Sequence, residues 1–107
     1  MKIDESETFI FSIISNVGMA RSCYIEAIKM AKAGDFDEAA RLMSEGDIYY
    51  HEGHQSHMNL IQLEAEGNGF APSLILTHAE DLLMSSEAVQ IIAAEMIDLH
   101  KIVLAKR

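Results

Sequence analysis

The chain has 107 residues, about the size of one domain, and half of them are apolar. Seventeen acidic residues against eight basic ones give a formal net charge of −9, which repels the phosphate backbone of nucleic acids and anionic lipid headgroups. The charge therefore argues against a nucleic-acid-binding protein. The apolar surplus favours a symmetric oligomer, because a single chain of this length has too little interior to bury it all.

The amino-terminal residues are acidic where a secretory signal needs a basic region, and no apolar stretch is long enough to span a bilayer. The single cysteine, Cys23, has no partner for an internal disulfide and stands among helix-forming residues, so we expect it to pack in the core. Together these features predict a cytoplasmic protein.

The first expected helix spans residues 4–33. Asp4 followed by Glu7 is typical of a helix start, and Gly34 is typical of a helix end. The apolar residues between these ends recur at helical spacing: Phe9, Ile10, Ile13, Ile14, Val17, Ala20, Tyr24, Ala27, Ile28 and Ala31.

The second expected helix spans residues 35–66, with Asp35 as N-cap and Glu38 at the capping-box position. Gly46 and Gly53 stand inside it. A glycine in a helix interior costs about 1 kcal/mol relative to alanine, so we expect another side chain or backbone to approach closely at these two positions.

The third expected helix spans residues 73–105 and follows a loop that contains Gly67, Gly69 and Pro72. Each helix of about 30 residues would be about 45 Å long, so the short connections force neighbouring helices to run antiparallel. The sequence therefore predicts an all-α protein, a single domain over residues 1–107 that folds as an up-down-up three-helix bundle.

His78 and Asp81 stand three residues apart on the third helix and therefore share a face. In one interpretation the start of this helix is simply solvated, with Asp81 favoured by the positive end of the helix dipole. In the other, His78 is a nucleophile, because a histidine with one unprotonated, exposed ring nitrogen can carry a phosphoryl group. Four residues continue this face as a mostly apolar strip: Leu82, Ser85, Val89 and Ile92.

His51, His54 and His57 form a loose stripe on the second helix. Helical two-histidine metal sites usually have a spacing of four, so we favour solvated or partner-facing histidines over a metal site here. A di-iron bundle is excluded, since no histidine has a glutamate three residues before it. The methionines are expected as adaptable core residues: Met19, Met30, Met43, Met58, Met84 and Met96.

Four segments, in their order and spacing, carry a resemblance to a known family: Gly18–Ser22, Glu26–Phe36, Glu64–Gly67 and Thr77–Ser85. Together they resemble the enzyme IIA component of the lactose/cellobiose class of the bacterial sugar phosphotransferase system. The resemblance implies a homotrimer in which His78 is the phosphorylated histidine. It also implies that Asp81 meets its symmetry mates around a metal ion at the three-fold axis, and Mg²⁺ is the natural ion for three carboxylates.

The resemblance further implies a phosphotransferase component that accepts a phosphoryl group from the carrier HPr. It would pass this group to the IIB component during uptake of a disaccharide such as cellobiose or lactose. The sequence departs from the family pattern near the site. The family commonly has glutamine where Glu80 stands, a second histidine where Leu82 stands, and Gln-Thr where His57-Met58 stands. We therefore treat His57 as a candidate neighbour of the phosphate.

Two other functions remain open at this stage. A histidine phosphotransfer module of a signalling pathway is also a helical bundle with one reactive histidine, although such modules usually place a lysine and a glycine shortly after it. A non-catalytic helical interaction protein would keep the fold without the chemistry, and Glu80 and Leu82 keep this alternative open.

Overall fold

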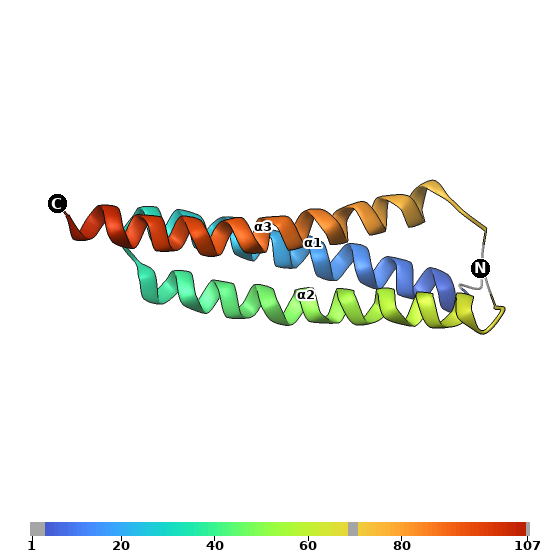
Figure 1. The fold of residues 1–107 in the computed structure, drawn as a ribbon. Helices are drawn as coiled ribbons and strands as arrows, with labels where there is room; N and C mark the ends of the chain where they lie inside the picture. The colour runs from blue at the N-terminus through green and yellow to red at the C-terminus, as the bar shows by residue number, and fades with distance from the viewer. Residues whose placement is uncertain (1–3, 69–70, 107) are drawn as a thin grey trace.

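The computed structural model describes residues 4–68 and 71–106 and contains three long helices: α1 (Glu5–Lys32), α2 (Phe36–Ala65) and α3 (Leu74–Ala105). They lie side by side in an up-down-up rod that measures 58 × 22 × 20 Å (Figure 1). The predicted all-α three-helix bundle is confirmed, and each helix lies within its expected range. Gly69 of the expected loop lies outside the described residues. None of the three helices is long and apolar enough to cross a membrane.

Each helix begins at a side chain that caps its first turn. A carboxylate oxygen of Asp4 accepts from the backbone N–H of Glu7 at 2.9 Å, and Asp35 accepts from Glu38 at 3.1 Å. The Ser73 hydroxyl caps α3 in the same way. These contacts satisfy backbone donors that have no partner inside the helix, so the predicted start signals at Asp4 and Asp35 are confirmed.

The turn between α1 and α2 needs a backbone conformation that glycine adopts easily. Gly34 has a φ of +83°, in the left-handed region where other residues are strained, and it follows Ala33, the C-cap residue of α1. Only residues 33–35 separate the two helices. A connection this short makes α2 reverse direction and pack along α1.

The core runs the length of the bundle, with α1 packed extensively against both other helices and a smaller contact between α2 and α3. Tyr24, Ile13 and Val17 of α1 are fully buried. The hydroxyl of Tyr24 donates to a carboxylate oxygen of Asp47 at 2.7 Å. Burial and the neighbouring Asp47 carboxylate raise the pKa of Tyr24, so the phenol keeps its proton and its hydrogen bond.

The two glycines inside α2 lie where α1 approaches most closely. A Cβ atom at Gly46 would lie 2.6 Å from the Tyr24 ring, and one at Gly53 would lie 2.5 Å from Cγ1 of Val17. Both distances are far below van der Waals contact. The close approach expected at Gly46 and Gly53 is therefore confirmed, and α2 continues through both positions without a break.

The expected burial of the methionines is wrong for three of them. Met19, Met58 and Met84 are 46%, 44% and 69% exposed in the single chain. Met19 and Met84 belong to a larger set of exposed apolar side chains on α1 and α3, which we call the outer apolar face. Its other members are Phe11, Ile25, Ile91, Ile92, Leu99, Ile102 and Val103.

Candidate functional site

The rotation of α3 about its own axis is fixed by three buried residues near its start. Ala79, Leu83 and Ser86 point inward, and the Ser86 hydroxyl donates to the backbone carbonyl of Val17 at 3.0 Å. Successive residues of an α-helix are about 100° apart, so two positions separated by two residues lie about 200° apart. His78 and Glu80 consequently lie on opposite flanks of α3.

His78 and Asp81 line the same surface depression, which has a volume of about 400 Å³. Both side chains are exposed. The structure thus brings together the two residues that the sequence singled out. The full set of lining residues is Arg21, His78, Asp81, Leu82, Met84 and Ser85.

The apolar strip predicted beside His78 and Asp81 begins in their depression, which Leu82 and Ser85 also line, and it runs along the boundary between core and surface. Leu82 and Val89 are partly buried and pack against the core clusters, whereas Met84 and Ile92 are more than half exposed. When two adjacent faces of a helix are both apolar, apolar residues recur at spacings of three and four on either face. The sequence pattern then does not show which of the two faces is buried. The packing of Ala79, Leu83 and Ser86 decides which of the two faces inward.

Arg21 of α1 is a site residue that the sequence did not single out, because it stood only within Gly18–Ser22, one of the segments that carry the family resemblance. The sequence does hold a signal, since Arg21 is the single charged residue between Glu7 and Glu26. A lone guanidinium in such an apolar stretch needs a reason. The structure places it in the depression with His78 and Asp81.

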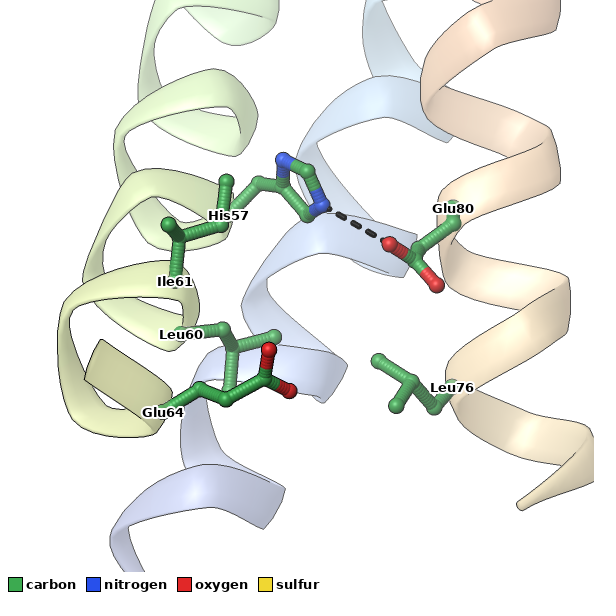
Figure 2. A pocket seen from close by; sticks show the side chains of 6 residues that line it. All are labelled: His57, Leu60, Ile61, Glu64, Leu76 and Glu80. Carbon is green, nitrogen blue, oxygen red and sulfur yellow. Dashed lines mark hydrogen bonds and ion pairs between the residues drawn. The ribbon is translucent and has the colours of Figure 1, made fainter. Parts of the chain in front are cut away.

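His57 lies on the other flank of α3, in a separate pocket of about 120 Å³ (Figure 2). Its Nε2 atom lies 3.0 Å from a carboxylate oxygen of Glu80, and the two side chains point toward each other across the gap between α2 and α3. This pocket and the His78 depression share no lining residue. The role of His57 as a phosphate neighbour therefore stays a prediction, while Glu80 is directed away from the His78 flank.

We expect the His57–Glu80 contact to couple α2 to α3 by about 0.5 kcal/mol, because Glu80 is half exposed and water screens the pair. A double-mutant cycle of His57→Gln and Glu80→Gln, followed by urea unfolding, measures this coupling. Glu64→Gln serves as control, since Glu64 lines the same pocket without bonding to His57. Equal coupling of His57 to Glu64 and to Glu80 would contradict the contact.

The remaining histidines of α2, His51 and His54, are not part of any cluster of three or more possible metal ligands in the described part of the chain. His54 stacks on Tyr50 with ring centroids 6.2 Å apart, and His51 is exposed. Among residues 4–68 and 71–106, no three His, Cys, Asp or Glu side chains lie close enough to hold a metal ion. A single chain contributes one carboxylate, that of Asp81, to the depression. A metal at Asp81 would therefore need carboxylates from further copies of the chain.

Comparison with known proteins gives one consistent answer. The family model for the lactose/cellobiose-specific IIA subunit of the phosphotransferase system matches residues 8–101. The oligo-β-mannoside-specific EIIA component of Bacillus subtilis (strain 168) is 39% identical over 95 residues, which cover 89% of this chain and 86% of the relative.

Two solved structures share the fold over nearly the whole chain. The crystal structure of the cellobiose-specific enzyme IIA from Bacillus anthracis is 39% identical, with a TM-score of 0.94, and the similarity covers 99% of this chain and 97% of that one. The IIA(chitobiose)–HPr complex of the Escherichia coli phosphotransferase system contains a chain that is 34% identical. Its TM-score is 0.80, and 94% of this chain and 98% of that one are covered. The chain therefore belongs to the family of lactose/cellobiose-specific IIA components of the phosphotransferase system.

Proposed function

We propose that this chain carries a phosphoryl group on His78, which it accepts from HPr and passes to the IIB component during sugar uptake. The observation that carries the proposal is the exposed His78 imidazole in a depression beside Asp81. A solved IIA relative in complex with HPr supports the choice of donor. This relay would act in the cytoplasm, the compartment expected from the sequence.

The transfer needs one free lone pair on the imidazole. An unprotonated ring nitrogen of His78 attacks the phosphorus atom of the phosphohistidine on HPr, and the new P–N bond forms as the old one breaks. The electron pair of the broken bond returns to the donor nitrogen. The proton on the other ring nitrogen of His78 stays in place, so no proton or co-reactant is consumed. In the onward transfer the acceptor atom on IIB forms a new bond to phosphorus, the P–N bond at His78 breaks, and its electron pair returns to the ring nitrogen of His78.

The outer apolar face supports assembly into a homotrimer. Its nine side chains are each at least 40% exposed in the single chain, and a soluble monomer rarely exposes so many apolar groups over two adjacent helices. Met84 stands one turn after Asp81, and both line the same depression. In the proposed trimer this face is the interface between copies, and the His78 depression opens at its edge.

Asp81 fits a metal ion only in such an assembly. Three carboxylates that meet in an apolar interface would repel one another and lose their hydration, at a cost of several kcal/mol. Carboxylate oxygens are ligands that Mg²⁺ accepts, and the ion would neutralise the three charges. In this proposal Mg²⁺ is structural, with one ion per trimer.

Replacing Asp81 by leucine is expected to remove the metal dependence of the trimer without dissolving it. Leucine adds apolar contact where the wild type brings together three charges, so the variant needs no ion. Sedimentation equilibrium with Mg²⁺ and with EDTA measures the effect. The wild type should dissociate more readily in EDTA, while Asp81→Leu should show the same mass in both buffers. A monomeric Asp81→Leu protein would contradict the placement of Asp81 at the axis.

The sugar is the least determined part of the proposal. The three relatives described above, at 34–39% identity, carry the names of an oligo-β-mannoside, cellobiose and chitobiose, all of them short sugar chains. We propose a substrate of this kind, a disaccharide such as cellobiose or lactose. The His78 depression has no contact with sugar in this mechanism, so selectivity for the sugar would lie in another component of the system.

Intact-mass spectrometry at alkaline pH tests the proposed function. The chain is incubated with phosphoenolpyruvate, enzyme I and HPr, and a parallel sample omits HPr. We expect a gain of one phosphoryl group that requires HPr and is lost on acidification, as a P–N bond is. An unchanged mass under conditions that phosphorylate HPr would favour a non-catalytic interaction protein instead.

A further inference from the structure

We propose that His57 is a positioning residue for phosphoryl transfer: by holding Glu80, it fixes the rotation of the α3 segment that presents His78. This inference rests on the proposed function and gives His57 a role that needs no contact with the phosphoryl group. Three observations carry it: the sparse packing of this segment, the contact that joins it to α2, and the opposite flanks on which Glu80 and His78 lie.

The first observation is that the first turns of α3 have little apolar packing. Ala79 is the only fully buried residue between Leu74 and Leu82, and its side chain is a single methyl group. Leu74 is 90% exposed and Ile75 is 44% exposed, while Leu76 is partly buried. A segment with few buried apolar contacts opens locally at low cost, so this part of α3 needs a further restraint.

The second observation is that a side-chain contact supplies this restraint. Nε2 of His57 lies 3.0 Å from a carboxylate oxygen of Glu80, and because an ionised carboxylate only accepts, the imidazole donates (Figure 2). The side chain of His57 is only 21% exposed, so the bond starts from a well-packed place on α2. Glu80 belongs to the turn of α3 that carries His78. The contact therefore joins this turn to α2.

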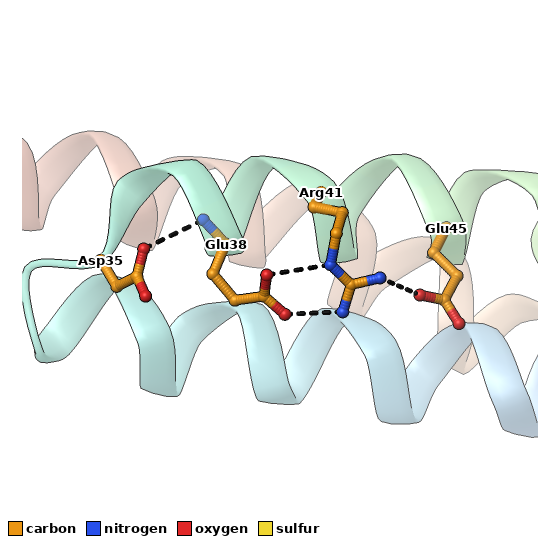
Figure 3. A network of polar contacts seen from close by, with 4 residues as sticks. All are labelled: Asp35, Glu38, Arg41 and Glu45. Atoms are coloured by element: carbon orange, nitrogen blue, oxygen red, sulfur yellow. Dashed lines mark hydrogen bonds and ion pairs between the residues drawn. The ribbon is translucent and has the colours of Figure 1, made fainter.

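Among the described residues, this is the one contact of a basic side chain with a carboxylate that joins two helices. Arg41 is bound on both sides by Glu38 and Glu45, at 2.6 and 2.8 Å, and all three residues belong to α2 (Figure 3). The remaining pair lies within α1. Pairs of this kind support a single helix and do not restrain its neighbours.

The contact between α2 and α3 continues a row of polar links along the same two helices. Gln90 donates to Asp47 at 2.7 Å, and Tyr50 donates to Glu87 at 3.4 Å. On both helices the first link is three residues from the second, and the second is seven residues from the contact described above. Equal steps in opposite directions are expected of two antiparallel helices in one register. The row ends at the turn that carries His78.

The third observation is that Glu80 and His78 lie on opposite flanks of α3. When Glu80 is held toward α2, the imidazole of His78 is turned away from α2 and toward the depression. A roll of this turn about the helix axis would change the direction in which the imidazole points. Phosphoryl transfer depends on that direction, because the attacking nitrogen must be aligned with the bond that breaks. His57 therefore favours the rotation in which HPr can reach His78.

The test measures kcat/KM for phosphoryl transfer from HPr with and without His57, in two backgrounds. In the wild-type background, His57→Ala should lower kcat/KM about two- to fivefold, the range that a half-exposed polar pair can supply. In the Glu80→Ala background the same change should have no effect, because the contact is already lost. His57→Gln should recover most of the rate, since its amide can still donate to Glu80. His51→Ala, which changes an exposed histidine of the same helix, is the matched control and should transfer at the wild-type rate.

A second readout separates positioning from general support of the fold. In His57→Ala, amide hydrogen exchange of the unphosphorylated protein should become faster in the first turns of α3 and stay unchanged in α1. His57→Leu keeps apolar volume in the pocket without the donor, and it repeats both measurements if the alanine variant does not fold.

Two results would overturn the inference: a wild-type rate in a folded variant without the donor, or exchange that becomes equally faster in all three helices. Absence of phosphorylation in the wild type would instead overturn the proposed function, and hydrogen exchange would still decide whether His57 holds the start of α3.

Discussion

Replacing His78 by alanine is expected to abolish phosphoryl uptake from HPr while leaving the fold intact. The imidazole is exposed and makes no contact in the core, so its removal leaves no cavity. The depression holds no second imidazole: its other lining side chains are Arg21, Asp81, Ser85 and two apolar residues. Intact mass after incubation with phosphorylated HPr should show no gain for His78→Ala.

Two controls make this result specific. His51→Ala removes another exposed histidine, on α2, and should be phosphorylated to the same extent as the wild type. The thermal midpoint and helix content of His78→Ala should match those of the wild type within experimental error, since surface substitutions usually change stability by less than about 0.5 kcal/mol. If His78→Ala still gained one phosphoryl group, another histidine would be the acceptor.

The second large effect concerns Gly53, where alanine is expected to destabilise the bundle by about 1–3 kcal/mol. An added Cβ would lie 2.5 Å from Cγ1 of Val17, which is fully buried and, as a β-branched residue in a helix, has essentially one favourable rotamer. Relief therefore requires α1 and α2 to move apart, which loosens the core around Val17. Urea unfolding followed by circular dichroism measures the change in the free energy of unfolding.

Gly18→Ala is the matched control, because it makes the same substitution in the interior of α1 at a position where the added Cβ would meet no atom within 4 Å beyond its chain neighbours and the nearby backbone of α1. Here alanine should stabilise the helix by about 0.5–1 kcal/mol. Combining Gly53→Ala with Val17→Ala should restore part of the loss, since the smaller residue makes room for the new Cβ. A stabilised Gly53→Ala protein would show that the two helices do not approach as closely as described.

Much of the fold could be predicted because its signals are local in the sequence. Asp4 and Asp35 each stand three residues before a glutamate, a pattern that indicates a helix start. In the structure both side chains accept hydrogen bonds from the expected backbone N–H groups. Gly46 and Gly53 are costly inside a helix, which correctly indicated close packing against a neighbour. These inferences need no knowledge of how the helices are rotated about their axes.

The contacts across helices could not be predicted, because they depend on that rotation. His57 and Glu80 are 23 residues apart on antiparallel helices, and nothing in either segment reveals that they meet. The burial of Met84 was misjudged for a related reason. Because α3 is apolar on two faces, its sequence does not show which face packs against the other helices of the same chain. Arg21 could not be assigned to the site from the sequence, because the residues with which it lines the depression are distant from it in the chain.

The central position of α1 has a consequence for how the protein is made. Because α1 packs extensively against α2, and α2 contacts α3 over a smaller area, the first two helices can pair as a hairpin while α3 is still in the ribosomal exit tunnel. The acceptor histidine arrives only with α3, the last of the three helices to be synthesised. An unfinished chain without α3 would therefore carry Arg21 of the depression but not the acceptor His78, and so could not draw phosphoryl groups away from working copies.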